Sequence, residues 1–278
     1  MNIAVIGMGI IGGSFCKALK KYTDHHIIGI NRTQSTLRRA FDDGVIDEMG
    51  DEHSLSKADV IYLAVYPQAA IDYVEKYGHF IKKGSIVTDS SGIKEEICPK
   101  LTALSEKFGF EFVGSHPMAG KETNGYESAE AEMYEGASYI IVPCKAREES
   151  VRILSDLALA MKFGSIKLTT PEEHDRMIAF TSQLPHVLAC AYVLSPCCPN
   201  HKGFSAGSYK DVSRVANINA KLWSELFMEN RGPLIGELDT LIDNIHAITD
   251  AVKASDVKTL ESLLEKAHKT KEMLGEGK

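Results

Sequence analysis

The chain has 278 residues, 44% of them hydrophobic and 25% charged, which is ordinary globular composition and excludes a disordered, collagen-like or coiled-coil protein. At about 150 residues per domain, this length predicts two domains. The 31 basic and 38 acidic residues give a net charge of −7, which argues against a general binder of nucleic acid or of membrane surfaces but leaves room for an anionic small-molecule substrate in a locally basic pocket.

The N-terminus, Met1-Asn2-Ile3-Ala4-Val5-Ile6-Gly7, lacks the basic region and the cleavage site of a signal peptide. No apolar run in the chain reaches the ~18 residues that a membrane span needs. The six cysteines are scattered and form no C-x-x-C pair, which is typical of reduced thiols. We therefore expect a cytoplasmic protein without a membrane partner.

Short β-branched runs alternate with helical patterns from residue 1 to about residue 170. The expected strands span residues 2–6, 26–30, 60–65, 85–89, 111–115, 138–142 and 165–169, and the expected helices include residues 11–21, 35–43, 68–77 and 148–163. Several of these strands are apolar almost throughout, as parallel strands buried on both faces are. The alternation predicts a doubly wound α/β domain of the Rossmann type with a parallel sheet over residues 1–170.

Strand patterns end at Pro171, where Pro171-Glu172-Glu173 has the composition of a helix start. An apolar stripe at spacings of three and four follows, at Leu234, Leu238, Leu241, Ile242, Ile245, Ile248 and Val252, and a further helix continues it with Leu260, Leu263, Leu264, Ala267 and Leu274. We expect residues 171–278 to form an all-helical domain that binds substrate and pairs with a second copy of the chain in a homodimer. The same stripe could instead serve only the core of one chain.

The segment Gly7-Met8-Gly9-Ile10-Ile11-Gly12 matches G-x-G-x-x-G between an expected strand and an expected helix. In that context Gly7 allows the tight turn, Gly9 lets the backbone approach a pyrophosphate, and Gly12 allows close helix–strand contact. The N-terminus of the helix then offers N–H donors to the phosphates. We expect all six residues, together with Ala64 and Val65, to bind a dinucleotide; the alternative is a plain glycine-rich turn.

Cofactor choice is expected to depend on Asn31-Arg32-Thr33, at the end of the second strand. An NAD enzyme usually places a carboxylate here to bind the ribose hydroxyls. Arg32 and the Thr33 hydroxyl can instead bind a 2′-phosphate. We predict a preference for NADP, with NAD possible, and leave open that Arg32 is a solvated charge that stacks on the adenine.

The segment Gly114-Ser115-His116-Pro117-Met118-Ala119-Gly120-Lys121-Glu122 follows an expected strand, at the sheet edge that faces cofactor and substrate. With this motif the chain resembles the prephenate/arogenate (cyclohexadienyl) dehydrogenase family of tyrosine biosynthesis. The resemblance extends over almost the whole chain, through Gly13-Ser14, residues 89–94, Tyr134-Glu135-Gly136, Pro171-Glu172-Glu173-His174-Asp175, Leu184-Pro185-His186 and residues 207–223.

The resemblance implies oxidative decarboxylation of prephenate, arogenate or both, a dianionic substrate, a nicotinamide cofactor and no metal. It implies that His116 bonds the ring hydroxyl, that His186 is a second active-site histidine, and that Arg214 clamps a carboxylate. The substrate-binding residues implied with them are Ser91, Lys121, Glu122, Gln183, Gly207, Lys210 and Asp211, with Trp223 beside the arginine.

The chain departs from the family pattern at two positions. Gly92 stands where the family often has an active-site serine, so that any hydroxyl contact has to come from Ser91. Gln183 stands where many relatives have a histidine, and a carboxamide cannot titrate.

Structural interpretations and other functions remain as alternatives to these assignments. His174 is expected to cap a helix or lie on the surface, and Arg214 with Asp211 could form only an intrahelical pair. Cys197, Cys198 and His201 lack a fourth metal ligand, and a helix break fits them better. Another two-domain oxidoreductase, such as a 3-hydroxyacid dehydrogenase or an imine reductase, would not explain His116 and His186 together. A non-catalytic NADP-binding regulator would bind cofactor and tolerate the loss of His116.

Overall fold

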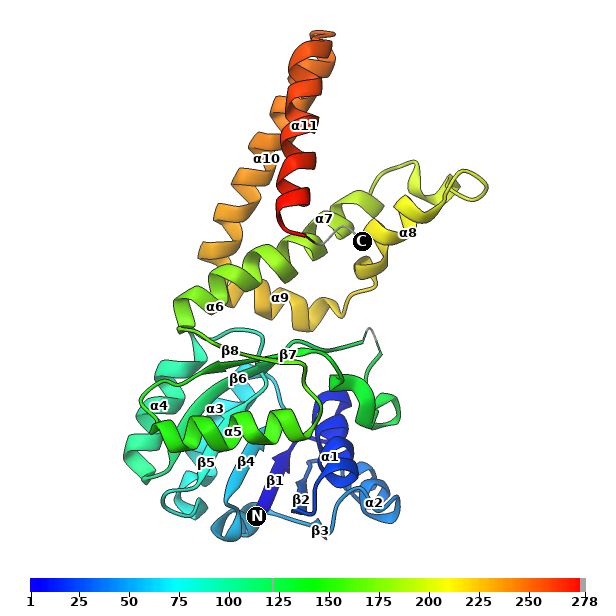
Figure 1. Cartoon of the computed structure of the whole chain (residues 1–278). Coiled ribbons are helices and arrows are strands. Elements are labelled where there is room, and N and C mark those ends of the chain that lie inside the picture. Colours follow the sequence, from blue (N-terminus) through cyan, green and yellow to red (C-terminus); the bar gives the residue numbers. More distant parts are fainter. Residues whose placement is uncertain (122, 276–278) are drawn as a thin grey trace. The chain divides into compact units, whose positions relative to one another are not determined.

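A computed structural model describes residues 1–121 and 123–275 of the chain (Figure 1). The described chain divides into two compact units, Met1–Asn230 and the residues from Arg231 onward. The first unit therefore holds the sheet together with the first helices that follow it. The domain boundary expected near residue 170 stays a prediction.

One eight-stranded sheet forms the centre of the first unit, in the order β3-β2-β1-β4-β5-β6-β7-β8 (Figure 1). The strands are β1 (Asn2–Ile6), β2 (His26–Ile30), β3 (Glu48–Met49), β4 (Val60–Leu63), β5 (Ile86–Asp89), β6 (Glu111–Pro117), β7 (Ser138–Val142) and β8 (Ser165–Leu168). All seven expected strands are confirmed. The two-residue β3 was not predicted, because a run this short carries no readable periodicity.

The parallel sheet expected from the sequence is confirmed for most strand pairs, and one pair toward an edge is antiparallel. Strands β1 to β6 pair in parallel, but β7 runs antiparallel to β6, and β8 is parallel to β7. Between β6 and β7 the described chain makes two 3₁₀ turns, Tyr126–Ser128 and Ala131–Tyr134, and no α-helix. Parallel strands need a long crossover, usually helical, so this connection returns the chain in the opposite direction.

Helices cover both faces of the sheet: α1 (Ile10–Tyr22), α2 (Gln34–Asp42), α3 (Pro67–Tyr77), α4 (Ile97–Phe108) and α5 (Glu148–Ala160) (Figure 1). Along β1, Ile3 and Val5 join the core under α1, α2 and α5, whereas Ala4 and Ile6 join the core under α3 and α4. Successive side chains of a strand point to opposite faces, so β1 is covered by a hydrophobic core on each face. The doubly wound architecture is confirmed.

The helical part of the first unit begins where the sequence predicts. In α6 (Pro171–Ile178) the Thr170 hydroxyl caps the helix by accepting from the Glu173 N–H, at 3.2 Å. A π-helical turn, Ala179–Gln183, leads into α7 (Leu184–Val193). Next come α8 (Gly207–Ser213), a 3₁₀ turn at Arg214–Ala216 and α9 (Ala220–Glu229). Helix α7 packs against α8 and against the Arg214–Ala216 turn.

The second unit is a helical hairpin of α10 (Arg231–Lys253) and α11 (Val257–Met273). The expected stripe lies on α10, where Leu238 and Leu241 are half-buried. Ile242, Ile245 and Ile248 are 40–46% exposed. The hairpin alone thus leaves much of its apolar surface uncovered. No helix in the described chain is both long and apolar enough to cross a membrane.

Candidate active site

The glycine-rich loop links β1 to α1 and is packed tightly on one side. Gly7 has a φ of +95°, and a Cβ there would lie 2.4 Å from the Ala64 carbonyl oxygen. A Cβ on Gly12 would lie 1.9 Å from the Gly7 carbonyl oxygen. Only glycine fits at these two positions, because any side chain would collide with backbone. A Cβ on Gly9 would meet nothing within 4 Å.

This geometry fits a dinucleotide. Gly9 precedes Ile10, the first residue of α1, so the uncrowded backbone lies at the N-terminus of a helix, where anions bind. Ala64 and Val65 border the loop, because the Cβ added at Gly7 would also approach the Val65 side chain. The Met8 side chain belongs to the hydrophobic core, so Met8 could reach a cofactor only through its backbone.

Asn31 connects the ends of the first two strands through its amide group. Its Oδ1 accepts from the Met8 backbone N–H at 3.1 Å, and its Nδ2 donates to the Thr33 carbonyl at 3.0 Å. Arg32 and Thr33 are exposed beside it, and the Thr33 side chain makes no capping hydrogen bond to α2. The edge where a carboxylate would bind a ribose therefore carries a guanidinium and a hydroxyl.

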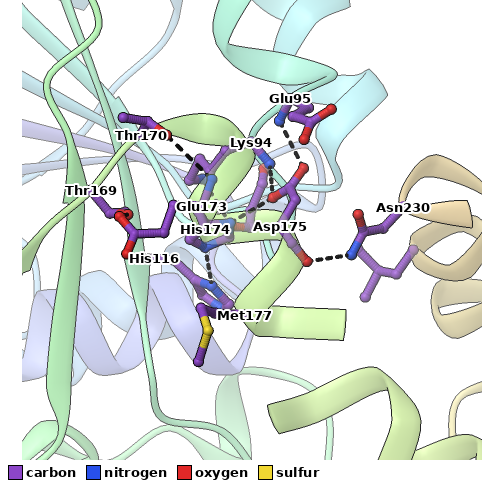
Figure 2. A network of polar contacts seen from close by, with 12 residues as sticks. Lys94, Glu95, His116, Thr169, Thr170, Glu173, His174, Asp175, Met177 and Asn230 are labelled. Carbon is purple, nitrogen blue, oxygen red and sulfur yellow. Dashed lines mark hydrogen bonds and ion pairs between the residues drawn. The ribbon is translucent and has the colours of Figure 1, made fainter. Parts of the chain in front are cut away.

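His116 lies near the end of β6 and begins a chain of hydrogen bonds that leads into the protein interior (Figure 2). Its Nδ1 is 3.0 Å from Nε2 of His174, and Nδ1 of His174 is 2.6 Å from Oδ1 of Asp175. The Asp175 carboxylate also accepts the backbone N–H groups of Lys94 and Glu95, at 2.7 and 2.8 Å. These bonds attach the first turns of α6 to the loop after β5.

The surface or capping role expected for His174 is wrong, because its side chain is buried, with the residue only 2% exposed. Burial lowers the pKa of His174 to about 3. Burial, together with the neighbouring His174 and Lys94, lowers the pKa of His116 well below its ordinary range. Both imidazoles are therefore neutral near neutral pH. Burial raises the pKa of Asp175, and the two backbone N–H bonds oppose that effect.

A buried ion pair fixes the loop that carries Ser91 and Gly92. Asp89 and Lys94 are both inaccessible to solvent, with Nζ 2.6 Å from Oδ2. Asp89 also accepts from the Ser115 N–H at 3.0 Å, and Lys94 donates to the Ser91 carbonyl at 2.9 Å. Since an unpaired buried charge is costly, the pair holds the ends of β5 and β6 in one arrangement.

Gly92 borders His116. A Cβ on Gly92 would lie 3.8 Å from Cε1 and 3.9 Å from Nε2 of the His116 ring. The Ser91 hydroxyl is buried and has no hydrogen-bond partner among the described residues. Nε2 of His116 therefore faces a position without a side chain.

Gln183 connects α6, α7 and α9 from inside the protein. It is 1% exposed. Its Nε2 donates to the Leu226 carbonyl at 3.1 Å, and its Oε1 accepts from Asn230 at 2.8 Å. Asn230 also donates to the Asp175 carbonyl at 2.9 Å. The carboxamide thus holds helices together, and sequence analysis missed this network because its partners are far apart along the chain.

His186 follows Gln183 by three residues and lies on α7 against α9. Its Nδ1 is 2.7 Å from the Ser182 carbonyl, which can only accept, so Nδ1 carries the proton. In the neutral ring Nε2 is then an acceptor. The ring stacks on Trp223, with centroids 3.7 Å apart and planes at 27°. His186 therefore has a fixed ring plane and a defined tautomer.

The remaining expected substrate-binding residues that the structure describes are exposed. Gly207, Lys210, Asp211 and Arg214 lie on α8 and at the start of the 3₁₀ turn after it, which pack against α7. Lys121 pairs with Glu130 at 2.5 Å. Glu122 lies outside the described residues.

No cluster of metal-ligating side chains occurs among the residues that the structure describes. His201 lies 3.0 Å from the Ser205 hydroxyl and stacks on Tyr209, and Cys198 lies 3.4 Å from the Tyr209 hydroxyl. These contacts place the segment around Cys197 in a helix break, between α7 and α8.

The chain resembles known proteins over both of its halves. Two family models match consecutive segments, the nucleotide-binding domain of prephenate dehydrogenase over residues 15–167 and the dimerization domain over residues 170–266. Prephenate dehydrogenase of Bacillus subtilis is 28% identical over 93% of this chain and 72% of its own length. Cyclohexadienyl dehydrogenase of Zymomonas mobilis is 28% identical over 92% and 89%.

A solved structure agrees with these sequence matches. The crystal structure of Synechocystis arogenate dehydrogenase superposes with a TM-score of 0.85 at 26% identity, over 99% of this chain and all of that one. The two family models leave only the first 14 residues, a two-residue junction and the C-terminal end unmatched. The chain therefore belongs to the prephenate dehydrogenase family.

Proposed function

We propose that this protein catalyses the oxidative decarboxylation of prephenate to 4-hydroxyphenylpyruvate, of arogenate to tyrosine, or of both, with NADP or NAD as cofactor. The observation that carries the proposal is His116, an imidazole held at the sheet edge by His174, with Nε2 beside Gly92, which has no side chain, and with a pKa lowered well below its ordinary range by burial. Membership of the family supports this function over the other oxidoreductases and the regulator.

The substrate ring carries a hydroxyl on the carbon that loses hydride, and a carboxylate across the ring. When bound, the nicotinamide ring supplies the hydride acceptor. Nε2 of His116 accepts the hydrogen bond of the ring hydroxyl and takes its proton as the C–O bond becomes a carbonyl. The bond to the carboxylate breaks, carbon dioxide leaves, and its electron pair enters the ring, which becomes aromatic. The ring oxygen then takes the proton back from His116, which gives the hydroxyl of the product and restores the neutral imidazole. General-base help of this kind contributes ~10²–10⁴ in rate.

Two negative charges on the substrate require cations in the site. Arg214 offers a planar guanidinium that binds a carboxylate through two parallel hydrogen bonds, which an ammonium cannot do. Lys210 lies one turn before it on α8. We assign Arg214 to a substrate carboxylate, and we assign Lys121, Glu122, Gly207, Lys210 and Asp211 to its surroundings. His186 is the second active-site histidine, oriented by Ser182 and Trp223.

NADP is the preferred cofactor in this proposal. Asn31 uses its amide within the protein, so the position holds no carboxylate to repel a 2′-phosphate. Arg32 and Thr33 are exposed next to it and can bind that phosphate.

A homodimer formed through the helical hairpin completes the proposal. Ile242, Ile245 and Ile248 on α10 are 40–46% exposed, and the segment lies within the match to a dimerization domain. Burial of such a stripe against a second copy is favourable, since complete burial of a fully exposed aliphatic side chain contributes ~1.5–3 kcal/mol and these side chains would contribute roughly half of that each. Sedimentation of the intact chain tests it, and a monomer at micromolar concentration would contradict it.

A steady-state assay with prephenate and arogenate, each against NADP and NAD, tests the proposed activity. We expect turnover with at least one of the substrates and faster turnover with NADP. His116→Asn serves as the control variant, with cofactor binding measured in parallel. Absence of turnover for all four combinations, in a folded protein that binds the cofactor, would contradict the proposal and favour a regulator.

A further inference from the structure

His174 is a buried residue with a hydrogen bond at each ring nitrogen, and the proposed reaction gives it no role. Its Nε2 lies 3.0 Å from His116 and its Nδ1 lies 2.6 Å from Asp175 (Figure 2). Both bonds are intramolecular, and the residue is 2% exposed. Water therefore cannot replace either partner, so the proton positions along this chain are determined by the protein.

The direction of the hydrogen bonds follows from Asp175. Both of its carboxylate oxygens already accept backbone N–H groups, from Lys94 and Glu95, as an ionised carboxylate does. Its Oδ1 can then only accept from His174, so the proton of His174 is on Nδ1. A neutral imidazole carries one proton, and its Nε2 is therefore an acceptor.

The same argument fixes His116. Because Nε2 of His174 accepts, Nδ1 of His116 has to donate the hydrogen bond between the two rings. His116 is neutral as well, so its Nε2 is unprotonated. That nitrogen is the one that faces Gly92, where a Cβ would lie 3.9 Å away. The opposite tautomer would present an N–H there, which cannot take a proton from a hydroxyl.

We propose that His174, held by Asp175, is a positioning residue that fixes the tautomer and ring orientation of His116, so that Nε2 is the base for the substrate hydroxyl. The proposal rests on the proposed function of His116. The Asp175 carboxylate sets the direction of these hydrogen bonds. It is held in place because it accepts two backbone N–H groups and because the Asp175 carbonyl accepts from Asn230. The chain of bonds thus links α6 and α9 to the end of β6.

A pair of amide variants separates this role from plain packing. In His174→Gln the amide can reach the former Nε2 position and accept from His116. In His174→Asn the shorter amide reaches the former Nδ1 position, so that it keeps the bond to Asp175 and loses the bond to His116. We expect His174→Asn to lower kcat by roughly 10–10³-fold, because a wrong tautomer removes the base. Substrate KM and cofactor Kd should change less than about threefold. His174→Gln should regain at least tenfold of the lost kcat.

Controls make the outcome specific. His246→Asn, an exposed change on α10, should leave kcat unchanged. In a His116→Asn background, His174→Asn should cost nothing further, because a residue that acts only through His116 has no independent effect. Equal kcat losses in the Gln and Asn variants, or a further loss in the double variant, would overturn the proposal. A normal kcat in His116→Asn alone would instead overturn the proposed function.

A measurement without substrate tests the proposal even if the His174 variants fold poorly. The ¹⁵N chemical shifts of His116 in the wild-type protein, assigned by comparison with His116→Asn, report which ring nitrogen carries the proton. We expect a protonated Nδ1 and an unprotonated Nε2 between pH 6 and 8. A protonated Nε2 would overturn the proposal and leave the assay of the proposed function unaffected.

Discussion

The glycine-rich loop and the Lys210–Arg214 segment are both parts of the proposed site, yet they are built in opposite ways. In the loop, backbone sterics decide the structure, since a Cβ on Gly7 or Gly12 would lie within 2.4 Å of a carbonyl oxygen. In the segment, the groups proposed to bind the substrate are exposed side chains on a seven-residue helix and the turn after it. A motif is therefore strongly predictive where packing admits one residue type, and weakly predictive where function depends on solvated side chains.

The largest effect is expected from the replacement of His116. This residue lies on a strand of the nucleotide-binding half, but it is proposed to act on the substrate. His116→Asn keeps a hydrogen-bonding group and removes the base, so kcat should fall by roughly 10²–10⁴-fold. Cofactor Kd should stay nearly constant. Steady-state kinetics with fluorescence titration of the cofactor measures both quantities, and a near-normal kcat would remove His116 from the chemistry.

Arg214→Ala tests the exposed Lys210–Arg214 segment. A charge-assisted hydrogen bond contributes ~1.5–3 kcal/mol, so KM for the substrate should rise roughly 10–200-fold. Because Arg214 is exposed, the melting temperature should change little. An unchanged KM with a lowered melting temperature would indicate a purely structural role, such as the intrahelical pair with Asp211.

The choice between NADP and NAD tests the exposed residues after β2. These lie beside the glycine-rich loop, whose structure is determined by backbone sterics. One Arg contact to a 2′-phosphate should favour NADP by roughly 5–150-fold in kcat/KM, and added salt should reduce that preference. Asn31→Asp combined with Arg32→Ala should reverse it, because the new carboxylate binds ribose hydroxyls and repels phosphate. Equal use of NAD and NADP by the wild type would show that Arg32 does not bind the phosphate.

Gly92→Ser tests whether the position beside His116 tolerates a side chain. A Cβ there would make ordinary contacts, 3.7 Å from Leu226 and 3.8 Å from His116, so the variant should fold with an unchanged melting temperature. Its hydroxyl could bond the ring hydroxyl of the substrate, and one neutral hydrogen bond should raise kcat/KM by roughly 2–10-fold. A lower kcat/KM at an unchanged melting temperature would mean that the substrate needs the open position.

The smallest effect concerns Glu229, at the end of α9. Its Oε2 is buried without a hydrogen-bond partner among the described residues. Burial and the nearby Glu225 and Glu96 raise its pKa to about 7. Since the folded state binds this proton more tightly than the unfolded chain, stability falls as pH rises from about 4.5 to about 7. The advantage of Glu229→Gln in melting temperature should therefore grow by about 1–4 °C between pH 5 and pH 8. A constant difference would contradict the shifted pKa.

Local patterns predicted most of the sheet. Apolar β-branched runs marked seven strands, and most of these are buried, where few other residue types fit. The edge strand β8 is the exception, since Ser165, Lys167 and Leu168 are exposed. Glu48–Met49 and the reversed direction of β7 were not predicted. Strand direction depends on how the connection from β6 travels in space, and neither the run Tyr139-Ile140-Ile141-Val142 nor its neighbours encode that path.

By itself, the sequence determined the glycine-rich loop, the doubly wound sheet, the start of the helices at Pro171, and His116 at the end of its strand, because each depends on residues close together in the chain. Only the tertiary structure decided the roles of His174 and Gln183. Apart from Asp175, which follows His174 directly, their partners are distant: His116, Leu226 and Asn230 lie 43 to 58 residues away. Burial removes water as an alternative partner, so such polar side chains bond whatever the fold brings beside them.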